Sequence, residues 1–324
     1  MDPLSDVMSL LKPRSYSAGG FDIGPGLSLG VGKHDGVKCY AVSSGQLWLT
    51  VEGIAPPLLL QTGDCFVLPR GRPFSFASDP EAAPVDFRTL WKQGGNGGVR
   101  TGNGGGSFFM VGGHFRLEGA QADMLLGALP PIVHIRSAAD RAALRWGIER
   151  MGEELRQPQP GSTLIVQQLA YSLLVQALRL HLAEAMSGSV GWLFALADPQ
   201  MNAALSAMHA DPAQRWTLQD LAEAAGMSRT SFAVRFKASV GTAPMDYLTR
   251  WRMLLAGDKL CFSGQSTSAI AQAVGYESES AFSTAFKRVM GCAPRQYGRD
   301  GRAAAIQPVL GNAMLPTAVE AAAG

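Results

Sequence analysis

A seven-residue frame occurs twice near the C-terminal end of this 324-residue chain, fifty positions apart. GTAPMDY occupies residues 241–247 and GCAPRQY occupies residues 291–297, so Gly, Ala, Pro and Tyr recur at identical spacing. The similarity extends upstream, where LAEAAG at 221–226 corresponds to IAQAVG at 270–275. Internal repetition of this kind predicts two small units of the same fold that follow one another in the chain.

Each repeat unit has the pattern of a helix-turn-helix. In the first unit, LQDLAEAA carries its apolar residues on one helical face, and Gly226 allows the left-handed turn that ends the helix. Ser228 can cap a following helix, on which Phe232 and Phe236 lie four positions apart and would face a small core. Residues 267–290 repeat this arrangement, with one residue more in the turn. The small alanines of each first helix allow the close helix crossing that such a turn requires.

The repeated frame marks the end of each unit. Gly241 and Gly291 can terminate the second helix, and Pro244 and Pro294 suit the first turn of the element that follows. After Pro244, MDYLTRWRMLLAGDKL continues with helical character for about fifteen residues, which is roughly 22 Å at 1.5 Å per residue. We therefore predict an all-α C-terminal domain in which a rigid linker helix joins two helix-turn-helix units.

The N-terminal half has a different pattern. Residues 21–116 combine short apolar runs with Gly and Pro, as in CYAVSSGQLWLTVEG and LLLQTGDCFVLPRG, which predicts the short strands of a β-barrel. From about residue 120 to 186 the apolar spacing becomes helical. We expect an α+β chain with a barrel and its following helices in residues 1–190 and the tandem domain in 191–300. An Ala-rich tail, 301–324, is expected to be disordered.

Charge and cysteine content restrict the class of protein. Residues 213–300 hold eleven Lys and Arg against seven Asp and Glu, whereas residues 1–190 hold sixteen of each. The basic excess therefore lies in the duplicated region, which is compatible with DNA binding. The four cysteines are scattered without a C-x-x-C pair, which argues against a disulfide framework or a zinc site. We see neither a signal peptide nor an uninterrupted membrane span, and expect a cytoplasmic protein without a membrane partner.

The tandem units resemble the AraC/XylS family of transcription regulators. The resemblance rests on the frame Gly-x-Ala-Pro-x-x-Tyr in both copies and on IAQAVGYESESAFSTAFKRVMGCAPRQY, and it covers about residues 190–300. It implies that the second helix of each unit enters one of two neighbouring major grooves on one face of double-stranded DNA. The chain would then be a sequence-specific transcription regulator, with activation favoured over repression and RNA polymerase as a candidate partner.

The same resemblance assigns DNA contacts residue by residue. In the first unit the assigned residues are Ser228, Arg229, Thr230, Ala233, Val234, Arg235 and Lys237. In the second unit they are Ser278, Glu279, Ser280, Ser283, Thr284, Lys287 and Arg288, followed by Arg295 and Tyr297. Val234 stands where family members often have Arg, so the first helix lacks one guanine reader and would meet thymine methyl groups instead. Glu279 would accept from a cytosine amino group or remain a solvated charge.

The predicted barrel resembles a cupin, and more closely the cupin-like sensor domains that are fused to this kind of DNA-binding domain. Gly63, Pro69 and Gly71 fit the second cupin motif, but Phe74 stands where a metal-binding His would be. Of the four usual metal ligands only His34 is present, which is too few to hold an ion. We therefore expect no metal, no cofactor and no enzyme activity.

A barrel without a metal can still bind a small-molecule effector in its interior. Candidate pocket residues are His34, Lys38, Tyr40, Trp48, Phe66, Phe74 and Phe76, for each of which ordinary core packing is the alternative. Lys38, Arg70 and Arg72 would favour an anionic or hydroxylated ligand if they point inward, although exposure is the usual state of such side chains.

Two further expectations concern assembly and function. The apolar helices at residues 140–186 would form a homodimer interface, as the resemblance implies, or else would pack against the barrel of their own chain. Besides the ligand-sensing regulator, two hypotheses stay open. One is a cupin enzyme with an accessory DNA-binding module, and the other is a ligand-independent dimeric DNA-binding protein whose barrel is only a scaffold.

Overall fold

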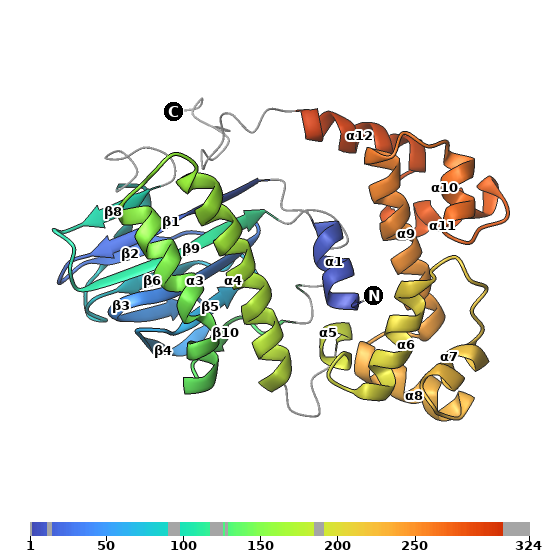
Figure 1. Ribbon diagram of the computed structural model, residues 1–324, viewed down its shortest axis with the longest axis horizontal. Helices are drawn as coiled ribbons and strands as arrows, with labels where there is room; N and C mark the ends of the chain where they lie inside the picture. The colour runs from blue at the N-terminus through green and yellow to red at the C-terminus, as the bar shows by residue number, and fades with distance from the viewer. Residues whose placement is uncertain are drawn as a thin grey trace, which may run out of the picture.

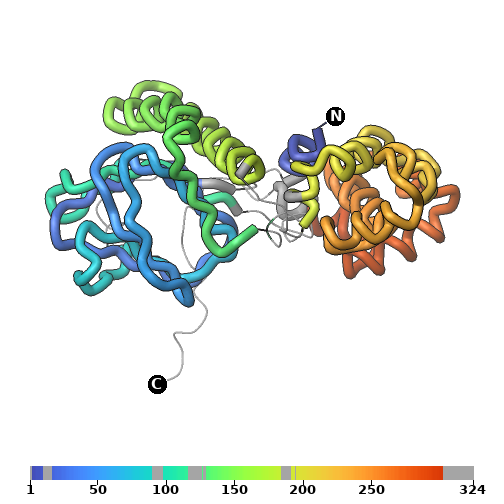
Figure 2. The backbone as a smooth tube through the Cα atoms, turned by 90° about the horizontal axis from the view of Figure 1, so that it is seen from below, coloured from blue at the N-terminus to red at the C-terminus, as the bar shows by residue number. Residues whose placement is uncertain are grey.

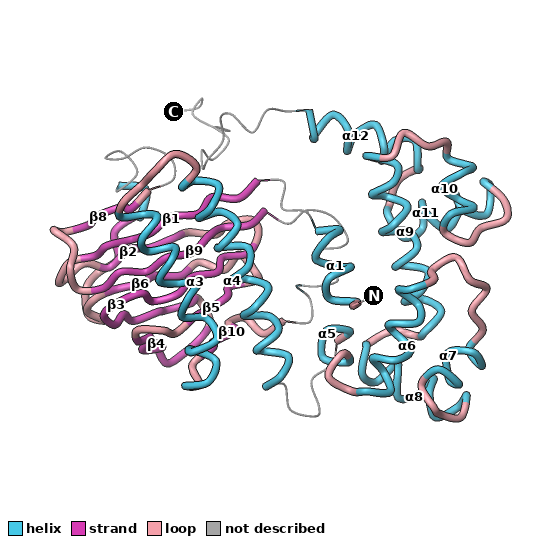
Figure 3. Tube along the Cα trace, in the orientation of Figure 1, coloured by secondary structure: helices cyan, strands magenta, loops and turns pink. Residues whose placement is uncertain are grey.

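The computed structural model separates a strand-rich part from an all-helical part, with the first helix between them (Figure 1). Colouring by secondary structure shows the same division (Figure 3). The structure describes residues 2–11, 15–89, 98–116, 126, 129–184 and 191–306. The predicted fold class, a barrel-like β domain with following helices and an all-α C-terminal domain, is confirmed.

The N-terminal strands form one continuous, strongly curled sheet. Its strands are β1 Ser15–Ile23, β2 Ser28–Val31, β3 Val37–Val51, β4 Ile54–Gln61, β5 Cys65–Leu68, β6 Phe74–Ala77, β7 Pro84–Asp86, β8 Val99–Gly102, β9 Phe108–Arg116 and β10 Val133–Ile135. The main path runs β7-β2-β6-β3-β9-β1-β8, while β4 and β5 pair with β3, and β10 pairs with β5. The first half of β3 pairs with β5 and β9, and the second half pairs with β4 and β6. The β3–β9 register shifts between Val42 and Ser44, which is where a bulge can bend a strand.

Alternate side chains of this sheet face two different cores. Cys39 and Ala41 point toward the helices that cover the outer face, whereas Tyr40 and Val42 point into the curled sheet. The inner core is aromatic and aliphatic and includes Phe21, Leu29, Leu49, Phe66, Phe76, Phe108 and Met110. A half-barrel with a dense apolar interior results.

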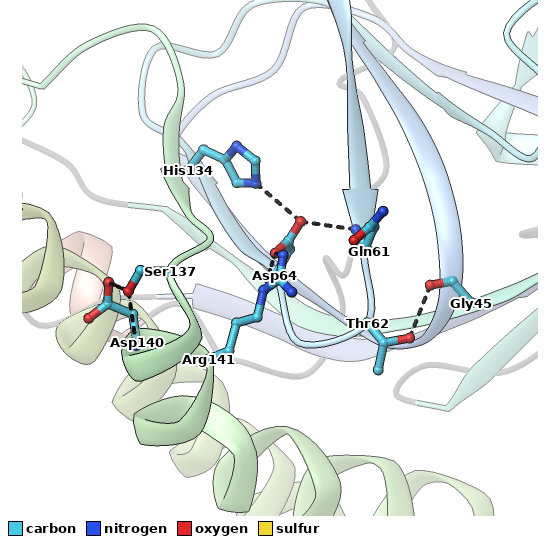
Figure 4. A network of polar contacts seen from close by, with 8 residues as sticks. All are labelled: Gly45, Gln61, Thr62, Asp64, His134, Ser137, Asp140 and Arg141. Atoms are coloured by element: carbon cyan, nitrogen blue, oxygen red, sulfur yellow. Dashed lines mark hydrogen bonds and ion pairs between the residues drawn. The ribbon is translucent and has the colours of Figure 1, made fainter.

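Two long helices cover the outer face of the sheet, α3 Ala138–Arg156 and α4 Ser162–Glu184. A buried carboxylate fixes the start of α3 against the turn between β4 and β5 (Figure 4). Asp64 is 2% exposed, accepts from the backbone N–H of Gln61 at 2.9 Å and from Arg141 at 2.7 Å, and lies 3.3 Å from His134. Burial lowers the pKa of His134. The arginine is therefore the cation that balances Asp64 at neutral pH.

The C-terminal part contains the two predicted helix-turn-helix units. Its helices are α5 Trp192–Ala195, α6 Pro199–Ala210, α7 Leu218–Ala224, α8 Arg229–Val240, α9 Pro244–Phe262, α10 Thr267–Ala273, α11 Glu279–Met290 and α12 Pro294–Ile306. We call α6–α8 the first head and α10–α12 the second head. Ser228 and Ser278 cap α8 and α11 as expected, and the left-handed residues Gly241 and Gly291 end them. The linker helix α9 extends over 19 residues.

The last helix, α12, continues past residue 300 to Ile306. It packs against α9. The first six residues of the expected tail are therefore helical. Residues 307–324 of that tail, and residues 185–190 at the expected domain boundary, lie outside the described part of the chain.

Helix α1, Pro3–Leu11, packs on the helical part of the protein although it precedes the barrel in the chain (Figure 2). It contacts α6 and α9. At this contact His209 is 4% exposed, stacks on Trp251 with ring centroids 3.9 Å apart, and lies 2.8 Å from the Tyr247 hydroxyl. Asp6 of α1 is 3.3 Å from the other ring nitrogen of His209. The sequence pattern had assigned this helix to the barrel domain without indicating the contact.

Candidate DNA interface

The first candidate reading helix, α8, has one buried side and one exposed side. Phe232, Phe236 and Val240 are buried and anchor α8 in the first head. The predicted contact residues on its other sides are exposed, namely Ser228, Arg229, Thr230, Val234, Arg235 and Lys237, while Ala233 is half-buried. Val234 has 68% of its surface exposed. A β-branched apolar side chain with no place in the core is thus available to a partner.

Arg235 already has partners within the protein. Its guanidinium donates to the Asp198 carboxylate and to the Gln200 side-chain oxygen, both at 2.5 Å. Asp198 is the N-cap of α6, so the contact joins α8 to the first helix of the same head. These contacts position α8 within the head, while Arg235 remains exposed and its phosphate contact stays a prediction.

The second candidate reading helix, α11, borders an open hollow of about 360 Å³. Phe282, Ala285 and Phe286 are its buried anchors. The hollow is lined by Thr267, Glu279, Ser280, Ser283, Thr284, Lys287, Ala293, Pro294 and Arg295. Six of these nine are residues that the sequence assigned to DNA contacts. The other three, Thr267 at the start of α10, Ala293 in the turn before α12 and Pro294 at the start of α12, were not assigned from the sequence and lie beside α11 in the folded head.

The hollow combines cationic and hydroxyl groups. Arg295 of α12 lies 3.7 Å from the Glu279 carboxylate, and both side chains remain solvent-accessible. The Thr284 hydroxyl donates to the Ser280 carbonyl at 3.0 Å, which leaves its oxygen able to accept from a partner. Ser278, the N-cap of α11, and Arg288, in its last turn, are both exposed.

The repeated tyrosine packs against a core in both heads, buried at Tyr247 and half-buried at Tyr297. Tyr247 is buried. Tyr297 lies 5.5 Å from the Phe286 ring, and a Cβ added at Gly257 of α9 would meet it at 3.0 Å. The Tyr297 ring therefore packs between the linker helix and the second head, and the phosphate contact of its hydroxyl stays a prediction.

The curled sheet brings together most of the candidate pocket residues. Tyr40, Phe66, Phe74 and Phe76 all belong to the inner core. Trp48 does not join them, because it alternates with the inward-facing Leu47 and Leu49 and so points to the other side of β3.

A buried lysine faces this inner core. Lys38 is 2% exposed, and burial lowers its pKa to about 8. Its ammonium nitrogen lies 6.0 Å from the centre of the Phe74 ring. No described carboxylate forms an ion pair with it. The two arginines considered with it are directed elsewhere, since Arg70 donates to the Leu129 carbonyl and Arg72 to that of Glu52.

His34 lies beside Lys38 at the same end of the half-barrel. Its ring is 5.7 Å from that of Phe74 and 5.8 Å from that of His114. Burial, reinforced by the charge of Lys38, lowers the pKa of His34 to about 3. His34 is thus a neutral imidazole at physiological pH.

Comparisons with known proteins agree with this architecture. A cupin family model matches residues 2–183, and a helix-turn-helix domain model matches residues 221–300. A putative AraC-like transcription regulator of Streptomyces lividans is 43% identical over 298 residues, which cover 92% of this chain and 98% of that relative. Another, from Streptomyces antibioticus, is 41% identical over 298 residues, which again cover 92% of this chain and 98% of the relative. The chain belongs to the AraC family of transcription regulators.

This AraC-family regulator binds DNA through its helix-turn-helix domain. Among solved structures, the DNA-binding domain of AdpA in complex with a target DNA is 30% identical, covers 33% of this chain and 95% of that one, and superposes with a TM-score of 0.31. None of the described helices of the regulator is long and apolar enough to cross a membrane.

The cupin match raises the question of a metal in the regulator's half-barrel. Within the described ranges, no three His, Cys, Asp or Glu side chains lie close enough together to hold an ion. Phe74 presents a ring edge to His34 where a second imidazole would be needed. The residues of this regulator therefore do not fit the metal site that the cupin motif implies, and no step of its function is derived through one.

Proposed function

We propose that this AraC-family regulator reads its operator with the exposed faces of α8 and α11 and adjusts transcription when a small molecule binds in the half-barrel. The observation that carries the first part is the hollow at α11, where Ser283, Thr284 and Lys287 converge beside Arg295. Hydroxyl groups that can donate or accept, flanked by cations for phosphates, are what base reading and backbone attachment require.

The two helices would contribute different kinds of contact. On α11, Thr284 and Ser283 would meet base edges while Lys287 and Arg295 meet phosphates. On α8, the exposed Val234 would contact thymine methyl groups, with Arg229 and Lys237 on the backbone. We therefore expect the first head to prefer A·T-containing subsites.

Selection of bound DNA from a random duplex library tests this function. The expected result is one motif composed of two subsites about one helical turn apart, as neighbouring grooves on one face require. Recovery of unrelated sequences at moderate salt, with no shared motif, would refute sequence-specific reading.

For the sensing function, the buried Lys38, which has no carboxylate partner among the residues that the structure describes, favours a small anionic or hydroxylated effector. The aromatic walls formed by Tyr40, Phe66 and Phe74 would hold its apolar part. A panel of small aromatic and aliphatic carboxylates should raise the melting temperature of the wild type, because a ligand that binds only the folded state stabilises it. The same compounds should have no effect on Lys38→Met. Equal shifts for both proteins would exclude Lys38 from the ligand site, and the absence of a shift in either protein would argue for a barrel that serves only as a scaffold.

We also propose a homodimer formed through α3 and α4. Trp146 on α3 is 71% exposed, and Leu164 and Ile165 on α4 are 65% and 40% exposed, although the opposite faces of these helices pack on the sheet. Sedimentation of wild type and Trp146→Glu at equal concentration tests the interface, and an unchanged sedimentation coefficient would exclude Trp146 from it. The remaining proposals are a cytoplasmic location, where DNA is accessible, activation through RNA polymerase, and no enzyme activity.

A further inference from the structure

We infer that the two heads are locked at one fixed separation by a direct contact between them, centred on Arg252, and that this contact sets which spacing of operator subsites the protein accepts. This inference rests on the proposal that α8 and α11 both read DNA. It goes beyond that proposal by naming the residues that hold the two helices in register.

The two heads have separate cores on the linker helix. Tyr247, Leu248 and Trp251 of α9 pack with the first head, whereas Met253 and Leu260 pack with the second. Among the described residues, Leu255 of α9 and Met290 of α11 are the two apolar side chains that pack against both cores. Apart from these two, the angle between the heads depends on α9 and on the polar contacts between the heads.

Arg252 supplies a second connection. From α9 its guanidinium donates to the carbonyls of Pro212 and Gln214 at 2.6 and 2.7 Å. Both carbonyls belong to the loop 211–216, which leads from α6 into α7 of the first head. A planar guanidinium with two fixed donors is suited to holding two carbonyls at once.

The same guanidinium faces the second head. It lies 5.9 Å from the centre of the Tyr276 ring, which in turn packs 5.8 Å from Phe282 of α11. Tyr276 precedes the Ser278 cap of α11, so any displacement of this turn moves the start of the candidate reading helix.

The backbones of the two heads also meet directly. Gly275 has a φ of +83°, and a Cβ added there would lie 2.5 Å from the carbonyl oxygen of Ala213. An exposed ion pair between Arg215 and Glu277 joins the same two segments. We call the loop 211–216, Arg252 and the turn Gly275–Tyr276 the interhead clasp.

The clasp has a defined consequence for DNA recognition. After one head has bound, the second binds as an intramolecular partner, and its effective concentration at a subsite depends on how rigidly it is held. Adding one base pair between the subsites moves the second by about 3.4 Å along the axis and roughly 34° around it. A rigid pair of heads rejects that change, whereas a pair connected only through α9 tolerates it better.

The chain offers matched variants for a test. Arg252→Gln removes the two-pronged donation, and Arg250→Gln removes an equal charge from an exposed position on the same helix. Gly275→Ala introduces a side chain against Ala213, whereas Gly226→Ala imposes the same left-handed strain at the equivalent turn of the first head, with nothing within 4 Å of the new Cβ. Arg252→Gln and Gly275→Ala thus disrupt the clasp at two different residues. If one variant misfolds, the other still tests the proposal.

The experiment measures the affinity of the full-length protein for the library-selected operator and for operators with one base pair added or removed between the subsites. We expect wild type, Arg250→Gln and Gly226→Ala to lose about tenfold on the altered spacings, and Arg252→Gln and Gly275→Ala to lose no more than about threefold. Thermal unfolding monitors folding of every variant. If both clasp variants lost as much affinity on the altered spacings as the wild type does, the clasp proposal would be wrong and two-headed reading would stand. A wild type indifferent to spacing would overturn both the clasp and two-headed reading.

Discussion

Acidification from pH 7.5 to pH 5.5 should destabilise the contact between α1 and the DNA-binding domain through His209. Burial lowers the pKa of His209 to about 3 in the folded protein, from an ordinary value of 6.5. The unfolded chain therefore takes up a proton below pH 6.5 that the folded chain does not. The contribution of His209 to the free energy of unfolding is therefore largest above pH 6.5 and decreases as the pH falls from there toward 3.

The size of the effect follows from the two pKa values. At pH 5.5 the unfolded imidazole is about ten to one protonated and the folded one is essentially neutral, so folding loses RT ln 11, about 1.4 kcal/mol. Because His209 is only 4% exposed, solvent screening does not reduce this figure appreciably. The loss is nearly independent of the exact folded pKa, provided that this pKa stays well below 5.5.

The assay is urea unfolding of wild type and His209→Gln at pH 7.5, 6.5 and 5.5, followed by tryptophan fluorescence. The stability difference between the two proteins should shift by about 1.4 kcal/mol in favour of the variant across this range. Asp6→Asn is the control, and it should keep the wild-type slope because it leaves His209 neutral. If acid instead stabilised the wild type relative to the variant, an Asp6–imidazolium ion pair would dominate over burial and the reasoning would be wrong.

Three further predictions concern the DNA interface and the half-barrel. Lys287→Ala should weaken binding to all sequences and lower the slope of log affinity against log salt by about one; an unchanged slope rejects a phosphate contact. Thr284→Ala should change the sequence recovered from a random library, and a uniform loss on every site would exclude base reading by this hydroxyl. Asp64→Ala should cost about 1–3 kcal/mol in chemical denaturation, because it removes the buried acceptor of the Gln61 backbone N–H and of the partly exposed Arg141; a cost below about 0.5 kcal/mol would show that water replaces the carboxylate.

Much of the DNA-binding domain could be predicted from short stretches of sequence. The signals are the caps at Ser228 and Ser278, the left-handed glycines at the helix ends and the phenylalanines four positions apart. Each acts within about one or two helical turns, so it can be recognised in the sequence without knowledge of the tertiary structure. The duplication then predicted two copies of one unit and the helix that joins them. The family resemblance predicted which surfaces face DNA.

Less of the half-barrel could be predicted, because strand direction and register depend on pairing. Lys38, Tyr40 and Phe74 do face the inner core, but the alternation that turns Trp48 outward becomes visible only once the register of β3 with its neighbours is known. The buried state of Lys38 was likewise undecided, since a lysine in a sequence is exposed by default.

The sequence by itself determined that this chain is an α+β regulator with two helix-turn-helix units, each with a capped second helix, joined by a linker helix. Only the tertiary structure decided that Arg235 pairs within its own head, that the Tyr297 ring packs against Phe286, and that Arg252 and Gly275 join the two heads. The physical reason is distance along the chain. Helix caps and turns are made by neighbours in sequence, whereas these contacts join segments that come together only when the separate helices pack.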